Sequence, residues 1–170
     1  MLLAHEKIEF HPVKRVIENK IEYNIPALQT TNAAACDFEA IEDMVIPSLF
    51  EQVWHGISHL EPPAIKPYLI RTGIKAIFPY HLGLFIANRS GGPKRGLVLS
   101  NSIGIIDADY ANNPKNDGEI MFAFYNFSLS PVHIKKGERI GQGWFARVYK
   151  ADNSKVLPKK REGGFNSTDY

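Results

Sequence analysis

The sequence predicts an all-β sandwich or barrel that carries one added helix. Three observations lead to this prediction. The chain has 170 residues, the usual length of one domain. Its 11 prolines and 13 glycines divide it into short segments. Most of these segments are rich in β-branched and aromatic residues, and many short strands with regular turns are typical of sandwiches and barrels.

The predicted strands follow one another from the middle of the chain to its C-terminal third. They are the runs 64–78, 81–87, 96–99, 103–107 and 119–127, and two strands around the turn 135–138 within 131–149. The run "EIMFAFYNF" (119–127) is apolar on both faces. We therefore expect this strand to lie between two covered sheets.

One amphipathic helix interrupts the β pattern. In "IPSLFEQVWHGISHLEPP" (46–63) apolar side chains recur every three or four residues, which predicts a helix over about 47–60. The stripe consists of Ile46, Leu49, Phe50, Val53, Trp54, Ile57 and Leu60. We expect it to pack on the protein's own β core. The alternative is an exposed stripe that binds a protein partner.

Charge and composition exclude several classes of protein. The formal net charge of +2 is too small to indicate a nucleic-acid or membrane surface. No apolar run approaches the roughly 18 residues of a membrane span, and the start "MLLAHEKIEF" is too polar for a signal peptide. Cys36 is the only cysteine, which fits a reducing compartment. We expect a soluble cytoplasmic protein.

The segment 89–110 carries the clearest candidates for chemistry. Arg89-Ser90-Gly91 follows a predicted strand, and a guanidinium, a hydroxyl and the amides of a glycine-rich turn can together bind phosphate oxygens. Asp107 ends an apolar run, where we expect a partly buried carboxylate that can accept a proton. Each feature alone is equally compatible with an ordinary solvated turn or strand end.

The C-terminal half adds further candidate ligands. Gln142 lies on a predicted strand after a tight turn. The tail 150–170 is polar and basic, as in disordered ends, yet Arg161 and Phe165 within it could close over a nucleotide. Metal-binding patterns are weak: His55 and His59 alone share a helical spacing, without the glutamate that a zinc protease needs between them.

Five short segments occur in an order found in one enzyme family. They are "AAACDF" (33–38), "RSG" (89–91), "GIIDADY" (104–110), "GERIGQ" (137–142) and "REGGFNST" (161–168). In this order they resemble the motifs of the trimeric deoxyuridine triphosphate nucleotidohydrolases, the dUTPases. The resemblance runs from about Ile8 to Thr168. The segment "ANNPKNDGEI" (111–120) resembles the longer turn of a subgroup from Gram-positive bacteria and their phages.

The resemblance implies a fold and an activity. The fold would be a dUTPase-like jelly roll or β-barrel over residues 1–160, with the added helix and a flexible C-terminal arm over 161–170 that closes over a nucleotide site. The activity would be Mg²⁺-assisted hydrolysis of dUTP to dUMP and pyrophosphate. The enzyme would be a homotrimer whose active sites each use three chains. A phage-encoded member would act in the host cytoplasm.

The resemblance also implies a role for each candidate residue. Asp107 would be the general base for the attacking water. Asp37 would contact the hydrated metal, which the triphosphate and waters hold without a direct protein ligand. Tyr110 would pack on the deoxyribose and exclude a 2′-hydroxyl. The phosphates would be held by Arg89, Ser90, Gly91, Gln142, Arg161, Ser167 and Thr168. Uracil would be read by Asn101 with the strand around Gly104, Ile105 and Ile106, and covered by Phe165.

Two alternatives remain at this stage. A deoxycytidine triphosphate deaminase shares the fold and the Arg-Ser turn. It needs a catalytic glutamate on the strand after the aspartate motif, typically near Thr-Leu-Glu, and "EIMFAFYNF" lacks that pattern. A regulatory or binding protein on a dUTPase scaffold is the second alternative. The added helix and the altered tail, with Asn166 and Asp169 in place of the family's glycines, keep it open. The first motif also departs from the family pattern, at Ala35 and Cys36.

Overall fold

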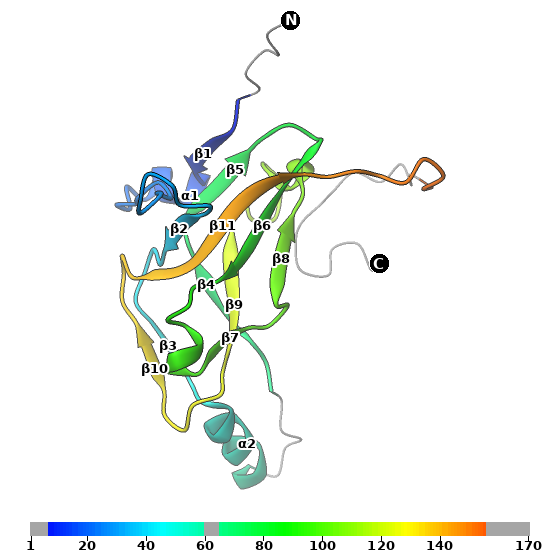
Figure 1. Ribbon diagram of the computed structural model, residues 1–170. Helices are drawn as coiled ribbons and strands as arrows, with labels where there is room; N and C mark the ends of the chain where they lie inside the picture. The colour runs from blue at the N-terminus through cyan, green and yellow to red at the C-terminus, as the bar shows by residue number, and fades with distance from the viewer. Residues whose placement is uncertain (1–6, 60–64, 156–170) are drawn as a thin grey trace, which may run out of the picture.

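The computed structural model describes residues 7–59 and 65–155. Within these ranges most of the regular secondary structure is β-strand (Figure 1). The elements are β1 (Glu9–Pro12), α1 (Lys14–Glu18), β2 (Cys36–Glu39), β3 (Met44–Ile46), α2 (Leu49–Ser58), β4 (Tyr68–Arg71), β5 (Ile74–Ile77), β6 (Leu82–Asn88), η1 (Pro93–Arg95), β7 (Leu97–Leu99), β8 (Ile103–Ile106), η2 (Ala108–Tyr110), β9 (Met121–Asn126), β10 (Val132–Ile134) and β11 (Arg139–Arg147). The all-β prediction is confirmed, and the structure adds a short helix, α1, that the apolar pattern did not indicate.

Antiparallel pairing assembles the described strands into small sheets. The largest has the order β2-β11-β6-β8, and a second has the order β4-β9-β7. Two-stranded pairs, β1-β5 and β10-β3, complete the arrangement. The predicted run 64–78 is divided at Thr72 and Gly73, so that β4 and β5 join different sheets. Gly73 has φ +72°, a backbone conformation that favours glycine and redirects the chain there.

The main core lies between the two larger sheets. Its fully buried side chains include Phe38, Ile46, Ile70, Ile74, Leu84, Ile120, Phe122, Phe124 and Ile134. On β9, Phe122 and Phe124 are buried on one face and Ala123 on the other, which agrees with the prediction of a strand covered on both faces. Gly141 on β11 is required by this packing, because a Cβ there would lie 1.9 Å from the Phe122 ring. The neighbouring Gln142 therefore points to the opposite, outer face of the sheet.

Helix α2 forms close to the predicted position. Ser48 caps it: the Glu51 backbone N–H donates to Ser48 Oγ at 3.0 Å, and the Ser48 N–H donates to the Glu51 carboxylate at 2.7 Å. Within the predicted stripe Ile46 is buried, Leu49 and Val53 are half-buried, and Leu60 lies outside the described residues. For the other three side chains the expected burial is wrong. Phe50, Trp54 and Ile57 are 62%, 61% and 57% exposed. The helix lies beyond the end of the sheets (Figure 1), where the core is already filled by strand residues.

Candidate functional site

A cluster of two cations and a carboxylate lies at one edge of the four-stranded sheet. Asp37 on β2 is directly opposite Gln142 on β11. Arg89, in the turn after β6, donates its Nε–H to Asp37 Oδ1 at 3.0 Å. Arg139 approaches Asp37 Oδ2 at 3.5 Å and donates to the Gln29 side chain at 2.7 Å. Two guanidinium groups around one carboxylate leave an excess positive charge at this edge, which suits an anion.

These residues line a cavity of about 460 Å³. We name it the cation cavity because two arginine side chains lie in its wall. Its walls are Gln29, Ala33, Ala34, Ala35, Asp37, Arg89, Ser90, Arg139, Gln142 and Trp144. Gly91 lines the adjoining depression on the other side of Arg89. Burial, and the Asp37 charge beside it, raise the pKa of the Cys36 thiol, so this cysteine stays protonated. The cavity is therefore equipped to bind anions and offers no thiolate nucleophile.

A second, smaller cavity of about 200 Å³ lies against β8 and β9. We name it the nucleoside cavity after the ligand that the motif resemblance leads us to expect there. Its walls are Ile86, Leu99, Asn101, Gly104, Ile105, Ile106, Tyr110, Glu119, Ile120, Met121 and Ala123. A Cβ on Gly104 would lie 2.5 Å from Ile86 Cγ1, so only glycine lets β8 lie this close to β6. The cavity thus combines apolar walls with the Asn101 carboxamide and strand backbone.

The acid nearest to this cavity is Glu119, and its carboxylate is already bound. It is fully buried and accepts hydrogen bonds from Arg71 Nε at 3.0 Å and from the Gly73 N–H at 2.9 Å. Arg15 lies 3.4 Å from its other side. Further along β9 the cavity is lined by Met121 and Ala123, which carry no acid. This arrangement gives no support to the deaminase alternative, which needs a glutamate able to exchange protons with a base.

The two cavities lie on opposite faces of the same sheet. Asp37 and Gln142 occupy the outer face, whereas Gly104 pairs with Ile86 on the inner face. Among the described residues, the cavities have no lining residue in common. Strands β2 and β8 are the two edges of the sheet, and three strand spacings separate them by roughly 14 Å. Within one chain the two cavities therefore do not form one continuous site.

Asp107 occupies the turn between β8 and η2. It is exposed, so the expectation of partial burial is wrong. The physical reason is its position at the end of an edge strand, with no further strand to cover it. It does not line either cavity of this chain. Asp109 in the following turn is also exposed.

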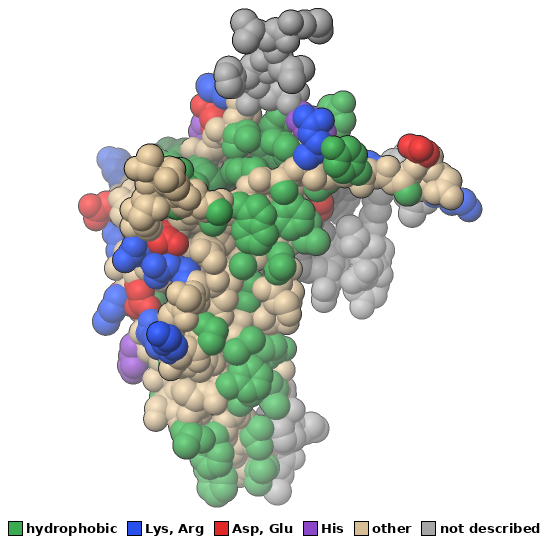
Figure 2. All heavy atoms as spheres, viewed as in Figure 1, with side chains coloured by type: hydrophobic (Ala, Val, Ile, Leu, Met, Phe, Trp, Pro, Cys, Tyr) green, Lys and Arg blue, Asp and Glu red, His purple; other side chains and the backbone are tan. Residues whose placement is uncertain are grey.

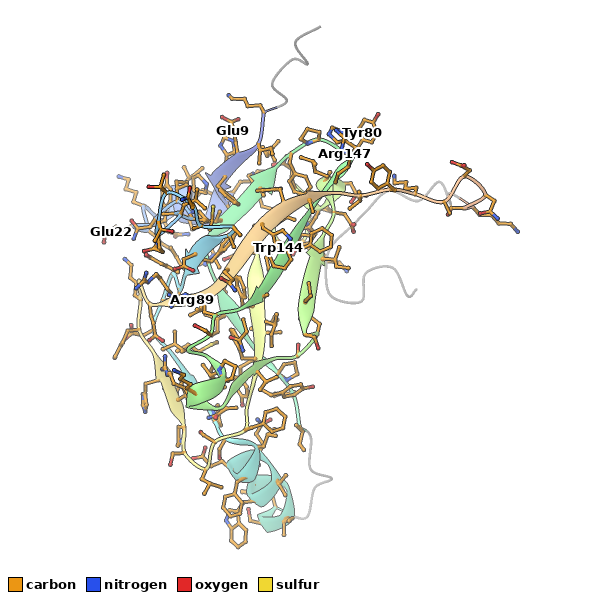
Figure 3. All side chains as sticks on the ribbon, in the orientation of Figure 1. Glu9, Glu22, Tyr80, Arg89, Trp144 and Arg147 are labelled. Carbon is orange, nitrogen blue, oxygen red and sulfur yellow. The ribbon has the colours of Figure 1, made fainter. Side chains whose placement is uncertain are left out.

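Some site residues were not evident from the sequence, and others lie outside the described ranges. Arg139, Gln29 and Trp144 line the cation cavity, although none of them was named as a candidate. Arg139 lies within the motif "GERIGQ", of which only Gln142 was selected. Strand alternation offered a signal for Trp144, because it lies two residues after Gln142 and shares its face. Figure 3 shows Arg89 and Trp144 on the side of β6 and β11 that faces the viewer. The candidates outside the described residues are Arg161, Phe165, Ser167 and Thr168.

Two absences concern only the part of the chain that the structure describes. No helix in it is long and apolar enough to span a membrane. No group of three or more histidine, cysteine, aspartate or glutamate side chains in it could hold a metal ion.

Comparison with known proteins places the chain in a family. The dUTPase family model matches residues 22–168. The deoxyuridine 5'-triphosphate nucleotidohydrolase of Lactococcus lactis is 40% identical over 147 residues, which cover 85% of this chain and 87% of the relative. The crystal structure of dUTPase from Streptococcus mutans is 30% identical, has a TM-score of 0.68 and is matched over 98% of its length by 85% of this chain.

A dUTPase variant from phage phi11 of S. aureus, whose structure concerns the coordination of a structural Mg(II) ion, shares the fold. It is 13% identical with a TM-score of 0.63, over 88% of this chain and 96% of that one. The ordered motifs, the paired cavities and the extent of these matches lead to one conclusion: the chain belongs to the dUTPase family.

Proposed function

We propose that this chain hydrolyses dUTP to dUMP and pyrophosphate. The observation that carries the proposal is the combination, in a member of the dUTPase family, of a nucleobase-sized cavity with a separate cavity that holds two arginines beside a carboxylate. A nucleoside triphosphate needs both an enclosed apolar pocket and a concentration of positive charge.

The nucleoside cavity would bind the deoxyuridine. The imide edge of uracil presents one donor between two acceptors, and the Asn101 carboxamide together with the β8 backbone supplies both kinds of partner. Ile86 and Leu99 offer apolar surface for the base. Tyr110 lines the same cavity and is buried, so its ring would lie against the sugar. The small volume favours a pyrimidine over a purine.

The cation cavity would bind the triphosphate. Arg89 and Arg139 would pair with phosphate oxygens, and Ser90 and Gln142 would donate further hydrogen bonds. Bound Mg²⁺ would offset the phosphate charge. A single carboxylate, Asp37, fits contact with the hydration shell of a triphosphate-bound Mg²⁺ better than direct ligation, because Arg89 and Arg139 already flank it.

Asp107 would act as the general base. Its carboxylate would take a proton from a water molecule, whose oxygen then attacks the α-phosphorus. The bond from that phosphorus to the bridging oxygen of the β-phosphate breaks, and pyrophosphate leaves with the bond electrons. The exposure of Asp107 in one chain supports a location at an interface, where a neighbouring chain would cover it.

A homotrimer would join the half-sites of different chains. Because the cation cavity and the nucleoside cavity lie on opposite faces of one sheet, one dUTP molecule would span cavities from two copies. The C-terminal arm, with Arg161, Phe165, Ser167 and Thr168, would come from a third. Each chain would then contribute to three active sites.

An exposed apolar row supports such assembly. Trp144 on β11, Phe85 on β6 and Ile105 on β8 are directly opposite one another across the outer face of the sheet. The Trp144 and Phe85 rings stack at 5.8 Å, and Ile105 is 63% exposed. Figure 2 shows hydrophobic side chains gathered over this part of the sheet. A row of this kind beside the cation cavity is a suitable surface for a second copy of the chain.

Parallel assays of pyrophosphate release from dUTP, dCTP, dTTP and UTP test the activity. We expect Mg²⁺-dependent hydrolysis of dUTP and much slower turnover of the other three. Comparable turnover of all four nucleotides would contradict the proposal. Mass measurement of wild type and Ile105→Asp tests the assembly: we expect a trimer for the wild type, and dissociation with loss of turnover for the variant. A fully active wild-type monomer would overturn the shared-site arrangement.

One observation favours a second role, the binding of a protein partner through α2. Phe50 and Trp54 stack at 6.5 Å on the exposed side of the helix, and Ile57 extends the same surface. Apolar side chains grouped this way often mark interaction sites. This role is compatible with dUTP hydrolysis. It predicts that substitutions on the stripe leave turnover unchanged and alter binding only.

A further inference from the structure

The hydroxyl group of Tyr110 is held from outside the nucleoside cavity. It donates to the backbone carbonyl of Glu119 at 3.0 Å and accepts from Asn116 Nδ2 at 2.7 Å. The backbone carbonyl of Tyr110 accepts from Asn113 Nδ2 at 2.8 Å. Both the ring tip and the backbone of this residue are therefore fixed, which leaves the buried ring little freedom to tilt or withdraw.

The amide of Asn116 is oriented by its own neighbours. Its Oδ1 accepts from the Gly118 N–H at 3.1 Å and from Asn113 Nδ2 at 2.6 Å. A backbone N–H can only donate, so it identifies the oxygen end of this amide and turns the NH₂ end toward Tyr110. Asn113 is oriented in the same way, since its Oδ1 accepts from the backbone N–H groups of Lys115 and Asn116.

The loop 111–118 that carries these amides is attached to the rest of the domain. Lys75 Nζ donates to Asn112 Oδ1 at 2.7 Å and to Asp117 Oδ2 at 2.9 Å. The Lys14 N–H donates to the same Asp117 oxygen at 2.8 Å. Asn112 and Asp117 both have positive φ, so the loop backbone holds conformations that asparagine and aspartate tolerate better than most residues. The loop that holds Tyr110 is therefore itself fixed to the domain by these hydrogen bonds.

We propose that Asn116 is a positioning residue for sugar selection, which holds the Tyr110 ring where it admits a 2′-deoxyribose and excludes a 2′-hydroxyl. This inference rests on the proposed function, in which Tyr110 packs against the sugar. A ribonucleotide would fit only if the ring moved away, and that movement breaks the hydrogen bond from Asn116. Loss of the bond eases entry of UTP, whereas dUTP needs no movement and is affected less.

The test is the ratio of kcat/KM for dUTP to kcat/KM for UTP in wild type, Asn116→Ala, Tyr110→Phe and the double variant. Each single variant loses the same hydrogen bond, whose net value of about 0.5–1.5 kcal/mol corresponds to a fall in the ratio of roughly 2- to 10-fold. The fall comes mainly from faster turnover of UTP. In the Tyr110→Phe background, Asn116→Ala is expected to change the ratio no further, because the shared bond is already absent.

Lys115→Ala is the matched control. Lys115 is exposed on the same loop, and its backbone N–H, which the substitution keeps, donates to Asn113 Oδ1. The ratio should therefore stay at the wild-type value. Thermal melts of every variant separate a local change from unfolding. Tyr110→Phe loses the bond from Asn116 together with the hydroxyl's bond to the Glu119 carbonyl. If Asn116→Ala does not fold, an unchanged ratio in Tyr110→Phe therefore still overturns the inference.

Three outcomes overturn the inference. The first is an unchanged ratio in Asn116→Ala or in Tyr110→Phe. The second is additive losses in the double variant, which would show that the two residues act independently. Either result, with a wild type that prefers dUTP, leaves the proposed function standing. The third is a wild type that does not hydrolyse dUTP in preference to UTP, and this result overturns the proposed function as well.

Discussion

Arg89 and Asp37 are 52 positions apart in the chain and form an ion pair of 3.0 Å, with the carboxylate of Asp37 only 8% exposed. The pair joins the turn after β6 to strand β2 and orders the guanidinium at the edge of the cation cavity. A triphosphate that enters would compete with Asp37 for Arg89. Asp37 would then be available to the hydrated metal.

Replacement of Arg89 by alanine is expected to raise the KM for dUTP more than it lowers kcat. Hydrogen bonds to charged groups contribute about 1.5–3 kcal/mol, which corresponds to roughly 10- to 100-fold in affinity. Steady-state kinetics measure the effect. Arg147→Ala is the control, because Arg147 is exposed and lies at the opposite end of β11 from Arg89 (Figure 3). An equal rise of the KM for dUTP in the two variants would show that the net charge of the protein, and not the position of Arg89, determines substrate affinity.

Asp107→Asn tests the general base. The amide cannot accept the proton of the attacking water, so kcat should fall by roughly 10²- to 10⁴-fold. Because Asp107 is exposed, the variant should keep the wild-type melting temperature and bind dUTP. Asp109→Asn removes an exposed carboxylate two residues away and should retain most activity. Near-normal turnover in Asp107→Asn would assign the base to another residue.

Trp54→Ala measures what the exposed helix stripe contributes to folding. Trp54 is 61% exposed. The free energy of unfolding of the variant should therefore lie within about 0.5 kcal/mol of the wild-type value, as is usual for substitutions at exposed positions. Phe38→Ala changes a fully buried position of the core. It should lower the free energy of unfolding by about 3–5 kcal/mol. Urea unfolding monitored by circular dichroism compares the two. A large loss in Trp54→Ala would show that the assembled protein buries this ring.

The Asp117 carboxylate should make stability depend on acid pH. Burial acts to raise the pKa of Asp117, but hydrogen bonds from the Lys75 ammonium and the Lys14 N–H outweigh it, and the net pKa lies below the usual value. A lowered folded-state pKa stabilises the protein above the unfolded value of about 3.9, and this contribution is lost as the pH falls through the folded-state pKa.

Asp117→Asn should therefore be less stable than the wild type at pH 7, and the difference should shrink below about pH 4. Urea midpoints at pH 7 and pH 3 measure it. Asp43→Asn is a control on the surface, where Lys135 lowers the pKa of the carboxyl in full contact with solvent. A constant difference between wild type and Asp117→Asn at both pH values would contradict the prediction.

Deletion of residues 161–170 should leave a folded trimer with strongly reduced turnover. The segment has few apolar side chains to stabilise a core, yet it carries Arg161 and Phe165. Mass measurement checks assembly, and steady-state kinetics check activity. Wild-type kinetics in the truncated protein would remove the arm from the mechanism.

The sequence by itself determined the elements whose signals are local. β-Branched and aromatic content indicated β6 and β11, and a run apolar on both faces indicated β9. The three- and four-residue spacing located α2, whose capping pair Ser48 and Glu51 is only three residues apart. The order of the motifs indicated the family, because Asp37, Arg89, Asp107 and Gln142 stand in short patterns of recognisable type.

The tertiary structure alone decided features that depend on contacts between distant parts of the chain. Glu119 pairs with Arg15, 104 positions away in the chain, and with Arg71, 48 positions away. No rule of sequence spacing predicts such pairs. The exposure of Trp54 could not be predicted either, because an apolar stripe indicates which face of a helix is apolar but not whether another part of the protein covers that face. Periodicity records local geometry, whereas burial and ion pairing are set by how the sheets close, which only the folded chain specifies.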